Sequence, residues 1–213
     1  MRKKSGIRSA PSLRKEASEQ RRQAILEAGL DVFAAQGFAA ARLDDVAEKA
    51  GVAKGTIYLS FNDKEDLFEQ IVLGALTPLL DRLDTIVSES DLPLDSILTG
   101  LFGVFQTEIL ATQRKEIMRL VITEGARFPK IAKFYHREVI AKAQALIRRA
   151  AKRAHQRGEL SSDALERFPH LVFAPLLVAV VWQAVFSKIE ALDVKGLLAA
   201  HREILLGIGK RGD

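Results

Sequence analysis

The chain has 213 residues, no cysteine and a formal net charge of +5 at pH 7. A chain of this length forms one large or two small domains and buries about 70% of its unfolded surface, so it needs no cross-links to fold. The lack of cysteine excludes disulfides, thiolate zinc sites and cysteine nucleophiles, and it agrees with a reducing compartment such as the cytoplasm.

Positive charge is concentrated at the start of the chain, where the first 22 residues carry eight basic and two acidic residues. Residues 1–17 contain glycine, proline and serine and show no clear helical period, so we expect a disordered basic arm. No apolar run follows the basic residues, which argues against a signal peptide. Two roles for the arm stay open: contacts to nucleic-acid phosphates, or solubility alone.

Residues 18–64 predict three short helices that pack together. Ser18 is the expected N-cap of the first helix, and Gln36-Gly37-Phe38 indicates its end. We expect the shared core to contain apolar side chains from all three helices: Leu30, Val32, Phe33, Phe38, Val46, Ile57 and Phe61.

Two helices of this unit are joined by a tight turn. Apolar residues recur at i, i+3, i+4 and i+7 from Leu43 to Ala50, which predicts a short helix with one buried face. Asp44 and Asp45 in its first turn match the helix dipole, and Gly51 supplies a left-handed residue that ends it. A second short helix begins near Lys54. This pattern indicates a helix-turn-helix, whose second helix lies in the DNA major groove.

The same region contains a long motif: AGVAKGTIY at residues 50–58, Phe61, and KEDLF at residues 64–68. In order, spacing and distance from the N-terminus, it resembles the DNA-binding domain of the tetracycline-repressor (TetR) family of bacterial transcription regulators. The resemblance covers residues 18–75. Farther along, Arg127-Phe128-Pro129 followed by Phe134-Tyr135 is similar to one large subgroup of that family.

The resemblance implies which side chains contact DNA. They are Arg42, Lys54, Gly55, Thr56, Tyr58, Leu59, Ser60 and Lys64. The residues at the start of the second helix would face bases or adjacent phosphates, whereas Arg42, Tyr58 and Lys64 would hold phosphates. The chain departs from the family pattern at Leu59-Ser60, where an aromatic residue or histidine is common. One phosphate contact is therefore lost there or supplied by Ser60.

The rest of the chain also predicts helices and shows no alternating strand pattern, so the expected fold class is all-α. A three-helix DNA-binding unit at residues 18–64 precedes a larger helical domain for ligand binding and dimerisation at residues 65–213. Pro78 is expected to interrupt or kink the helix that connects them.

The run LVFAPLLVAVVW at residues 171–182 has no polar side chain. It is shorter than the about 20 residues that a membrane span needs, so we expect a buried helix and no membrane partner. A helix that is apolar on all sides must be covered on all sides, and a second subunit is a natural cover. We therefore predict a homodimer formed by the last two helices, roughly Asp163–Ser187 and Asp193–Ile208.

The family resemblance further implies a ligand cavity among the helices of the larger domain. The candidate ligand-binding residues are Phe102, Phe105, Met118, Glu124, Arg127, Phe134, His136, Phe173 and Trp182. Val121, Ile122 and Leu177 can add apolar walls, and Gln183 is a further polar candidate. For any one of the apolar residues, an ordinary place in the core fits the sequence equally well.

No pattern of catalytic residues is present in the sequence. The four histidines are spread without metal-ligand spacing, and no nucleophile elbow, P-loop or dinucleotide fingerprint occurs. We therefore predict neither an enzyme nor a cofactor or metal site.

Together these features predict a ligand-responsive transcription regulator. It would be a repressor that binds a palindromic double-stranded DNA operator as a dimer and is released by a small apolar or amphipathic effector. The alternative is a helical DNA-binding or adaptor protein without a ligand switch.

Overall fold

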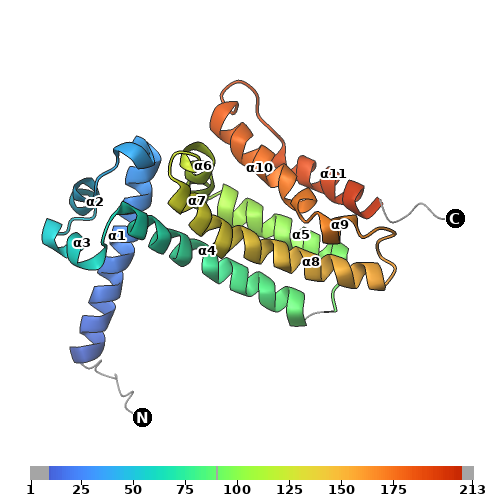
Figure 1. Ribbon diagram of the computed structural model, residues 1–213, viewed down its shortest axis with the longest axis horizontal. Helices are drawn as coiled ribbons and strands as arrows, with labels where there is room; N and C mark the ends of the chain where they lie inside the picture. Colours follow the sequence, from blue (N-terminus) through green and yellow to red (C-terminus); the bar gives the residue numbers. More distant parts are fainter. Residues whose placement is uncertain (1–9, 90, 208–213) are drawn as a thin grey trace, which may run out of the picture. The chain divides into compact units, whose positions relative to one another are not determined.

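Figure 1 shows the computed structural model of the chain, which describes residues 10–89 and 91–207. Every regular element in these residues is helical, which confirms the predicted all-α class. The chain divides into two compact units, residues 1–71 and residues 72–213. One helix, α4 (Lys64–Glu89), contains the last residues of the first unit and the first residues of the second.

The first unit contains α1 (Ala10–Ala40), α2 (Leu43–Lys49), α3 (Lys54–Ser60) and the start of α4. Helix α1 packs against α2, and α2 packs against α3. Gly37 interrupts the helical geometry of α1, because its φ of 77° and ψ of 161° lie outside the helical region.

Three aromatic rings form the centre of this unit. The ring of Phe33 lies 5.2 Å from that of Phe38 and 6.3 Å from that of Phe68, measured between centroids. Phe38 and Phe68 are 5.9 Å apart in an edge-to-face arrangement. All three side chains are buried, as are Ile57 and Phe61. The predicted core is therefore confirmed at Phe33, Phe38, Ile57 and Phe61, whereas Phe68 was not part of that prediction. Tilted and edge-to-face ring pairs are the favourable geometries for aromatic contacts.

The turn between α2 and α3 has the predicted geometry. Gly51 has a φ of 67°, and its N–H donates to the carbonyl of Glu48 at 3.1 Å. The next N–H, that of Val52, donates to the carbonyl of Ala47 at 3.0 Å. These two bonds are the Schellman arrangement, which satisfies the last carbonyls of α2 and requires a left-handed residue at Gly51.

The second unit continues α4 with nine further helical elements. They are α5 (Leu94–Val104), η1 (Phe105–Leu110), α6 (Arg114–Glu124), α7 (Pro129–Tyr135), η2 (His136–Ile140), α8 (Ala141–Gln156), α9 (Ala164–Arg167), α10 (His170–Val185) and α11 (Val194–Gly207). The elements η1 and η2 are π-helical turns that extend α5 and α7 without a break. Buried side chains of α5, α8, α10 and α11 form one core, which includes Leu98, Phe102, Ile147, Val172 and Ala179.

Helix α10 is buried on one side. Val172 and Ala179 face the core, whereas Leu171, Val178, Val181 and Val185 are exposed at intervals of three, four and seven residues. Val178 keeps 49% of its accessible surface and Val185 keeps 59%. The single chain therefore leaves an exposed apolar stripe along α10. The sequence predicts that this helix is covered on all sides, so within one chain the predicted cover is incomplete.

No single helix among residues 10–89 and 91–207 is long and apolar enough to cross a membrane. The bent pair Leu94–Leu110 and Arg114–Glu124, with 85° between its helices, has the necessary length and composition only when the two are taken together.

Two predicted boundaries differ from the structure. Helix α1 begins at Ala10, so residues 10–17 are helical and not part of a disordered arm, and Ser18 lies inside the helix. Residues 1–9 of the predicted arm lie outside the described residues. The predicted division at residues 64 and 65 falls at the start of α4, whereas the two compact units meet between Ile71 and Val72.

We expect the same substitution to have opposite effects at two glycines of the helix-turn-helix. Apart from the adjacent residues and the local helix backbone, a Cβ added at Gly51 or at Gly55 meets no atom of the described residues within 4 Å. Gly51→Ala should lower the free energy of unfolding by about 1 kcal/mol, because alanine disfavours a positive φ. Gly55→Ala should raise it by about 0.5 kcal/mol, because Gly55 is helical and alanine restricts the unfolded chain. Urea unfolding of both variants measures the two changes, and equal shifts would contradict the role of the turn.

Candidate nucleic-acid interface and ligand pocket

Helix α3 presents almost all of its side chains outward within the first unit. Ile57 is fully buried against α2 and is the only buried residue among the seven of α3. Tyr58 keeps 57% of its accessible surface and Leu59 keeps 91%. A short helix held by one apolar anchor, with an apolar residue as exposed as Leu59, has a face that is available to a partner.

A single carboxylate connects α2 to this exposed face. Asp44, in the first turn of α2, accepts a hydrogen bond from Lys54 Nζ at 2.8 Å through Oδ2 and one from the Tyr58 hydroxyl at 3.1 Å through Oδ1. The hydrogen bond from Lys54 lowers the pKa of Asp44, and the hydrogen bond to Asp44 raises the pKa of Lys54. Lys54 and Tyr58 lie one helical turn apart, so Asp44 places both on the same side of α3.

The other predicted residues of the interface surround this group. Arg42 is exposed at the N-cap position of α2, and Gly55 has open space where a side chain would stand. Thr56 is half-buried, and its carbonyl accepts a hydrogen bond from the Ser60 hydroxyl at 2.9 Å. The structure therefore brings the predicted residues of α2 and α3 to one surface of the first unit.

Lys64 differs from the rest of the predicted set. Its Nζ donates to the carbonyls of Phe38 and Ala39, each at 2.8 Å, and to that of Ala41 at 3.4 Å. It also lies 5.0 Å from the centroid of the Phe38 ring. Lys64 thus satisfies carbonyls at the end of α1, a role that the sequence did not indicate. Its predicted contact with a phosphate stays a prediction.

The second unit contains a hollow of about 210 Å³ among α6, α7, η2 and α10. Its walls are formed by Met118, Val121, Ile122, Ala132, Tyr135, His136, Ile140 and Leu177. None of these residues is a lysine, arginine, aspartate or glutamate. The hollow is smaller than the about 300–1,000 Å³ of most ligand pockets, and its apolar walls are typical of them.

Tyr135 supplies a polar group to this hollow. The side chain is buried, and its hydroxyl makes no hydrogen bond with the described residues. Among the described residues no fully buried side-chain nitrogen or oxygen lacks a partner, so the Tyr135 hydroxyl keeps some accessible surface, and Tyr135 is one of the residues that line the hollow. Burial raises the pKa of the Tyr135 hydroxyl well above its usual value, so the group stays protonated and can donate a hydrogen bond.

The predicted ligand residues are distributed over the second unit. Met118 and His136 line the hollow, together with the predicted walls Val121, Ile122 and Leu177. The other predicted residues lie outside the hollow. Phe102 and Phe105 belong to the core, Phe173 packs against it, and Glu124 is half-buried at the end of α6. The guanidinium of Arg137 lies over the Phe134 ring, that of Arg127 lies over the Phe128 ring, and Trp182 donates a hydrogen bond to the Glu190 carbonyl. Gln183 lines a separate hollow beside the ion pair of Arg119 and Glu116.

Sequence reasoning missed the roles of Asp44 and Tyr135. In the sequence, the helix dipole already accounts for Asp44, and the spacing of Asp44 to Lys54 and Tyr58 has no local period that could reveal a contact between two helices. Tyr135 belongs to the family resemblance but not to the predicted ligand residues. Its position one residue before the candidate His136 is the signal that the sequence offers.

Two family models match the chain. The model described as bacterial regulatory proteins, tetR family, matches residues 25–71, and the model of the tetracyclin repressor-like C-terminal domain matches residues 94–187. The first match contains α2 and α3, and the second contains the hollow.

Individual proteins are similar over most of the chain. The HTH-type transcriptional regulator SrpR of Pseudomonas putida is 28% identical over 173 residues, which are 80% of this chain and 78% of that protein. The uncharacterised HTH-type transcriptional regulator TtgW, also of Pseudomonas putida, is 32% identical over 114 residues, 53% of this chain and 81% of that protein. The solved structure of FadR from Bacillus subtilis with stearoyl-CoA aligns with a TM-score of 0.70 at 19% identity, covering 87% of this chain and 98% of that one.

Two lysines of the interface should behave differently when each is changed to methionine. Lys64→Met should lower the free energy of unfolding by about 2 kcal/mol, because several carbonyls lose a charged donor. Lys54→Met should leave the free energy of unfolding almost unchanged, because its ion pair is exposed. Urea unfolding measures both values.

Binding to duplex DNA at several KCl concentrations separates their roles at the interface. Lys54→Met should make the dependence of log K on log salt shallower by about 0.9, the value for one phosphate contact. A similar change for Lys64→Met would support its predicted phosphate contact, and an unchanged slope would assign Lys64 to the fold alone. An unchanged slope for Lys54→Met would remove Lys54 from the interface.

Proposed function

This chain belongs to the TetR family of bacterial transcription regulators and is a DNA-binding regulator of transcription, and we propose that it is a dimeric repressor released from its operator by a small uncharged molecule. The observation that carries the proposal is the exposed face of α3, which is anchored by Ile57 alone and carries the predicted DNA-contact residues. In a helix-turn-helix this helix lies in the major groove.

The chemistry of α3 suits both parts of DNA recognition. Lys54, Tyr58 and the exposed Arg42 offer donors to phosphates, which position the protein without reading sequence. Gly55 has no side chain, so the backbone of α3 can approach the base edges closely. Leu59, the most exposed apolar residue of the helix, can contact a thymine methyl group in the major groove.

The apolar stripe of α10 supports a second copy of the chain as the dimer partner. Leu171, Val178, Val181 and Val185 recur on one side of α10, and Ile204 of α11 is 62% exposed. Helix α10 packs against α11, so the two last helices can pair with the same two helices of another copy. Such a two-fold interface places two α3 helices on two half-sites, which requires a near-palindromic operator.

The hollow beneath α6 supports a small uncharged effector. A buried charge needs a partner, and the walls of the hollow provide none among lysine, arginine, aspartate or glutamate. The volume of about 210 Å³ is below that of most ligand pockets. This space suits a molecule of one substituted ring that accepts a hydrogen bond from the Tyr135 hydroxyl. FadR of Bacillus subtilis binds stearoyl-CoA, which is larger and charged.

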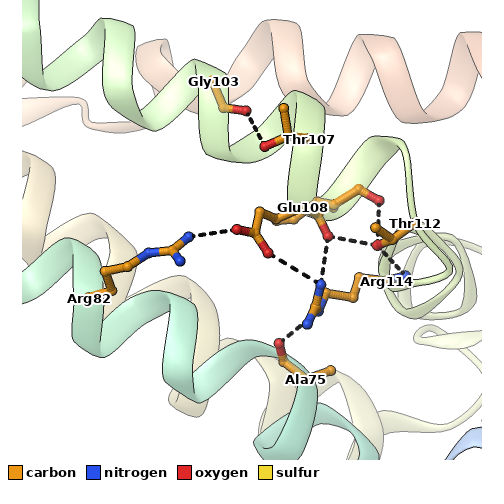
Figure 2. Close-up of polar contacts among 8 residues, drawn as sticks. Ala75, Arg82, Gly103, Thr107, Glu108, Thr112 and Arg114 are labelled. Atoms are coloured by element: carbon orange, nitrogen blue, oxygen red, sulfur yellow. Dashed lines mark hydrogen bonds and ion pairs between the residues drawn. The ribbon is translucent and has the colours of Figure 1, made fainter.

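A polar cluster connects α6 to α4 within the second unit, as Figure 2 shows. Arg114, the first residue of α6, donates through Nε to the carbonyl of Ala75 in α4 at 3.1 Å. Its Nη1 donates to the carbonyl of Glu108 at 3.1 Å and lies 3.6 Å from the Glu108 carboxylate. The other oxygen of that carboxylate pairs with Arg82 of α4 at 3.0 Å. The cluster therefore contacts α4 at two points.

These two points lie on either side of Pro78, which α4 contains in its interior. Proline has no N–H, so the carbonyl of Gly74 loses its helical donor and α4 is weakest at this position. Helix α6 carries Met118, Val121 and Ile122 of the hollow, so a molecule that displaces α6 also displaces Arg114. Because α4 is the covalent connection between the units, a change in its bend alters the spacing of the two α3 helices in a dimer.

We predict no catalytic activity for the chain. We predict a cytoplasmic location, because its partner is DNA. The alternative, a DNA-binding protein without a ligand switch, lacks a role for the Tyr135 hydroxyl and for the cluster of Arg114. A coupling of about 1–3 kcal/mol between effector and operator changes operator affinity by about 5- to 150-fold, which is adequate for release.

Selection of DNA duplexes from a randomised library by the full chain tests two claims of the proposed function, namely that the chain binds DNA and that it does so as a dimer. The recovered sequence should be near-palindromic. Val178→Arg should give a monomer in sedimentation at micromolar concentration. It should also lower operator affinity about 100-fold, because a monomer binds one half-site and loses the gain that comes from binding both half-sites with linked subunits. Leu92→Arg, at a residue of similar exposure in a loop, is the control and should leave both unchanged. A monomeric wild-type chain would refute the dimer.

Three matched probes test the effector class: 4-chlorophenol, 4-chlorotoluene and 4-chlorobenzoate. The first should bind best in calorimetry and weaken operator binding, and the charged benzoate should not bind. Tyr135→Phe should weaken 4-chlorophenol binding about two- to tenfold, the value of one hydrogen bond, and leave 4-chlorotoluene unaffected. Tightest binding of the benzoate would refute the uncharged class.

The same assay tests the polar cluster. Arg114→Met should retain 4-chlorophenol affinity but lose most of the effect of the probe on operator binding. Arg148→Met, which removes an exposed arginine of α8, should keep that effect. Full release by 4-chlorophenol in Arg114→Met would show that coupling does not pass through Arg114.

A further inference from the structure

Asp44 is an acidic side chain beside the surface that binds DNA, where phosphates repel a negative charge. Its two carboxylate oxygens accept hydrogen bonds from Lys54 at 2.8 Å and from the Tyr58 hydroxyl at 3.1 Å. Both partners belong to the predicted DNA-contact set. In the free protein, Asp44 therefore holds two side chains that α3 presents to DNA.

The contact compensates charge as well as fixing position. The hydrogen bond from Lys54 holds the pKa of Asp44 below its usual value, and Asp44 holds the pKa of Lys54 above its own. Both groups are therefore ionised at neutral pH, and the positive charge of Lys54 is matched by a negative charge. Asp44 is the more sheltered partner, with a side chain 26% exposed against 69% for Lys54.

Random DNA and an operator respond differently to these two effects. Binding to random DNA comes almost entirely from neutralised phosphates, so a compensated lysine weakens it directly. Binding to an operator also depends on side chains held in the correct positions, because ordering a free lysine during binding costs conformational entropy. The negative charge of Asp44 weakens binding to both kinds of DNA. Because Asp44 also fixes Lys54 and Tyr58, it lowers the entropy cost of forming the operator complex, so operator affinity falls less than affinity for random DNA.

We propose that Asp44 is a specificity-determining residue of the helix-turn-helix, which lowers affinity for random DNA more than affinity for the operator. It does so by compensating the charge of Lys54 and by fixing the positions of Lys54 and Tyr58. This inference rests on the DNA-binding function. If the wild-type chain showed no preference for an operator, the DNA-binding function itself would be refuted. If the wild-type chain shows the preference and the Asp44 variant keeps it unchanged, only the role of Asp44 is refuted.

The test replaces Asp44 by asparagine, which has the same shape and no charge. Binding to the selected operator and to a random duplex is measured between about 50 and 200 mM KCl. For random DNA, Asp44→Asn should steepen the slope of log K against log salt by about 0.9, so that its gain changes about threefold over this range and is largest at low salt. Operator affinity should rise less, so that the ratio of the two affinities falls.

Asp45→Asn is the matched control, because it removes the same charge from the same turn and Asp45 makes no hydrogen bond or ion pair with α3 among the described residues. It should leave the ratio of affinities unchanged. In the Lys54→Met background, Asp44→Asn should return the slope for random DNA to about the wild-type value, because the two changes together remove one charge of each sign, and it should change the ratio of affinities less than in the wild-type background. Thermal unfolding checks that each variant is folded, and Asp44→Ser supplies the same charge change if the asparagine variant unfolds. An unchanged ratio for Asp44→Asn, or an equal fall for Asp45→Asn, would overturn the proposal.

Discussion

The buried contact of Phe33, Phe38 and Phe68 is the interaction on which the DNA-binding unit depends. These rings bring α1 and α4 together, and Lys64 adds hydrogen bonds to the carbonyls beside Phe38. Helix α2 packs on this base, and α3 packs on α2 through Ile57. Because the apolar contacts of the unit lie on one side of α3, its opposite side is available to DNA.

Polar groups at the end of α1 and on α3 play different physical roles. Lys64 is half-buried, and its donors satisfy carbonyls that would otherwise lack partners. Lys54 is exposed and paired with one carboxylate, so water screens the pair and its contribution to stability is small. The same residue type therefore supports the fold at one position and is available to a ligand at the other. Burial and the number of partners, not charge, distinguish the two.

The second unit combines a closed core with two incomplete surfaces. The side of α10 that faces the core is buried, whereas its other side presents valines and leucines that a single chain does not cover. Beside α6, the packing leaves a hollow that is lined by the buried Tyr135, whose hydroxyl makes no hydrogen bond with the described residues. Both features lie on helices that also bury apolar side chains, such as Ile117 of α6 and Val172 of α10.

The sequence by itself determined the all-α class, the helix-turn-helix, the glycine that ends α2, and the core positions of Phe38, Ile57 and Phe61. These features follow from helical period, from the conformational freedom of glycine and from a motif with fixed spacing, all of which are local. Only the tertiary structure decided that Asp44 holds Lys54 and Tyr58, that Lys64 caps α1, and that Tyr135 rather than Phe102 or Trp182 faces a hollow. Each of these depends on the angle and register at which two helices pack, and helical period shows which face is apolar without showing which side chain it meets.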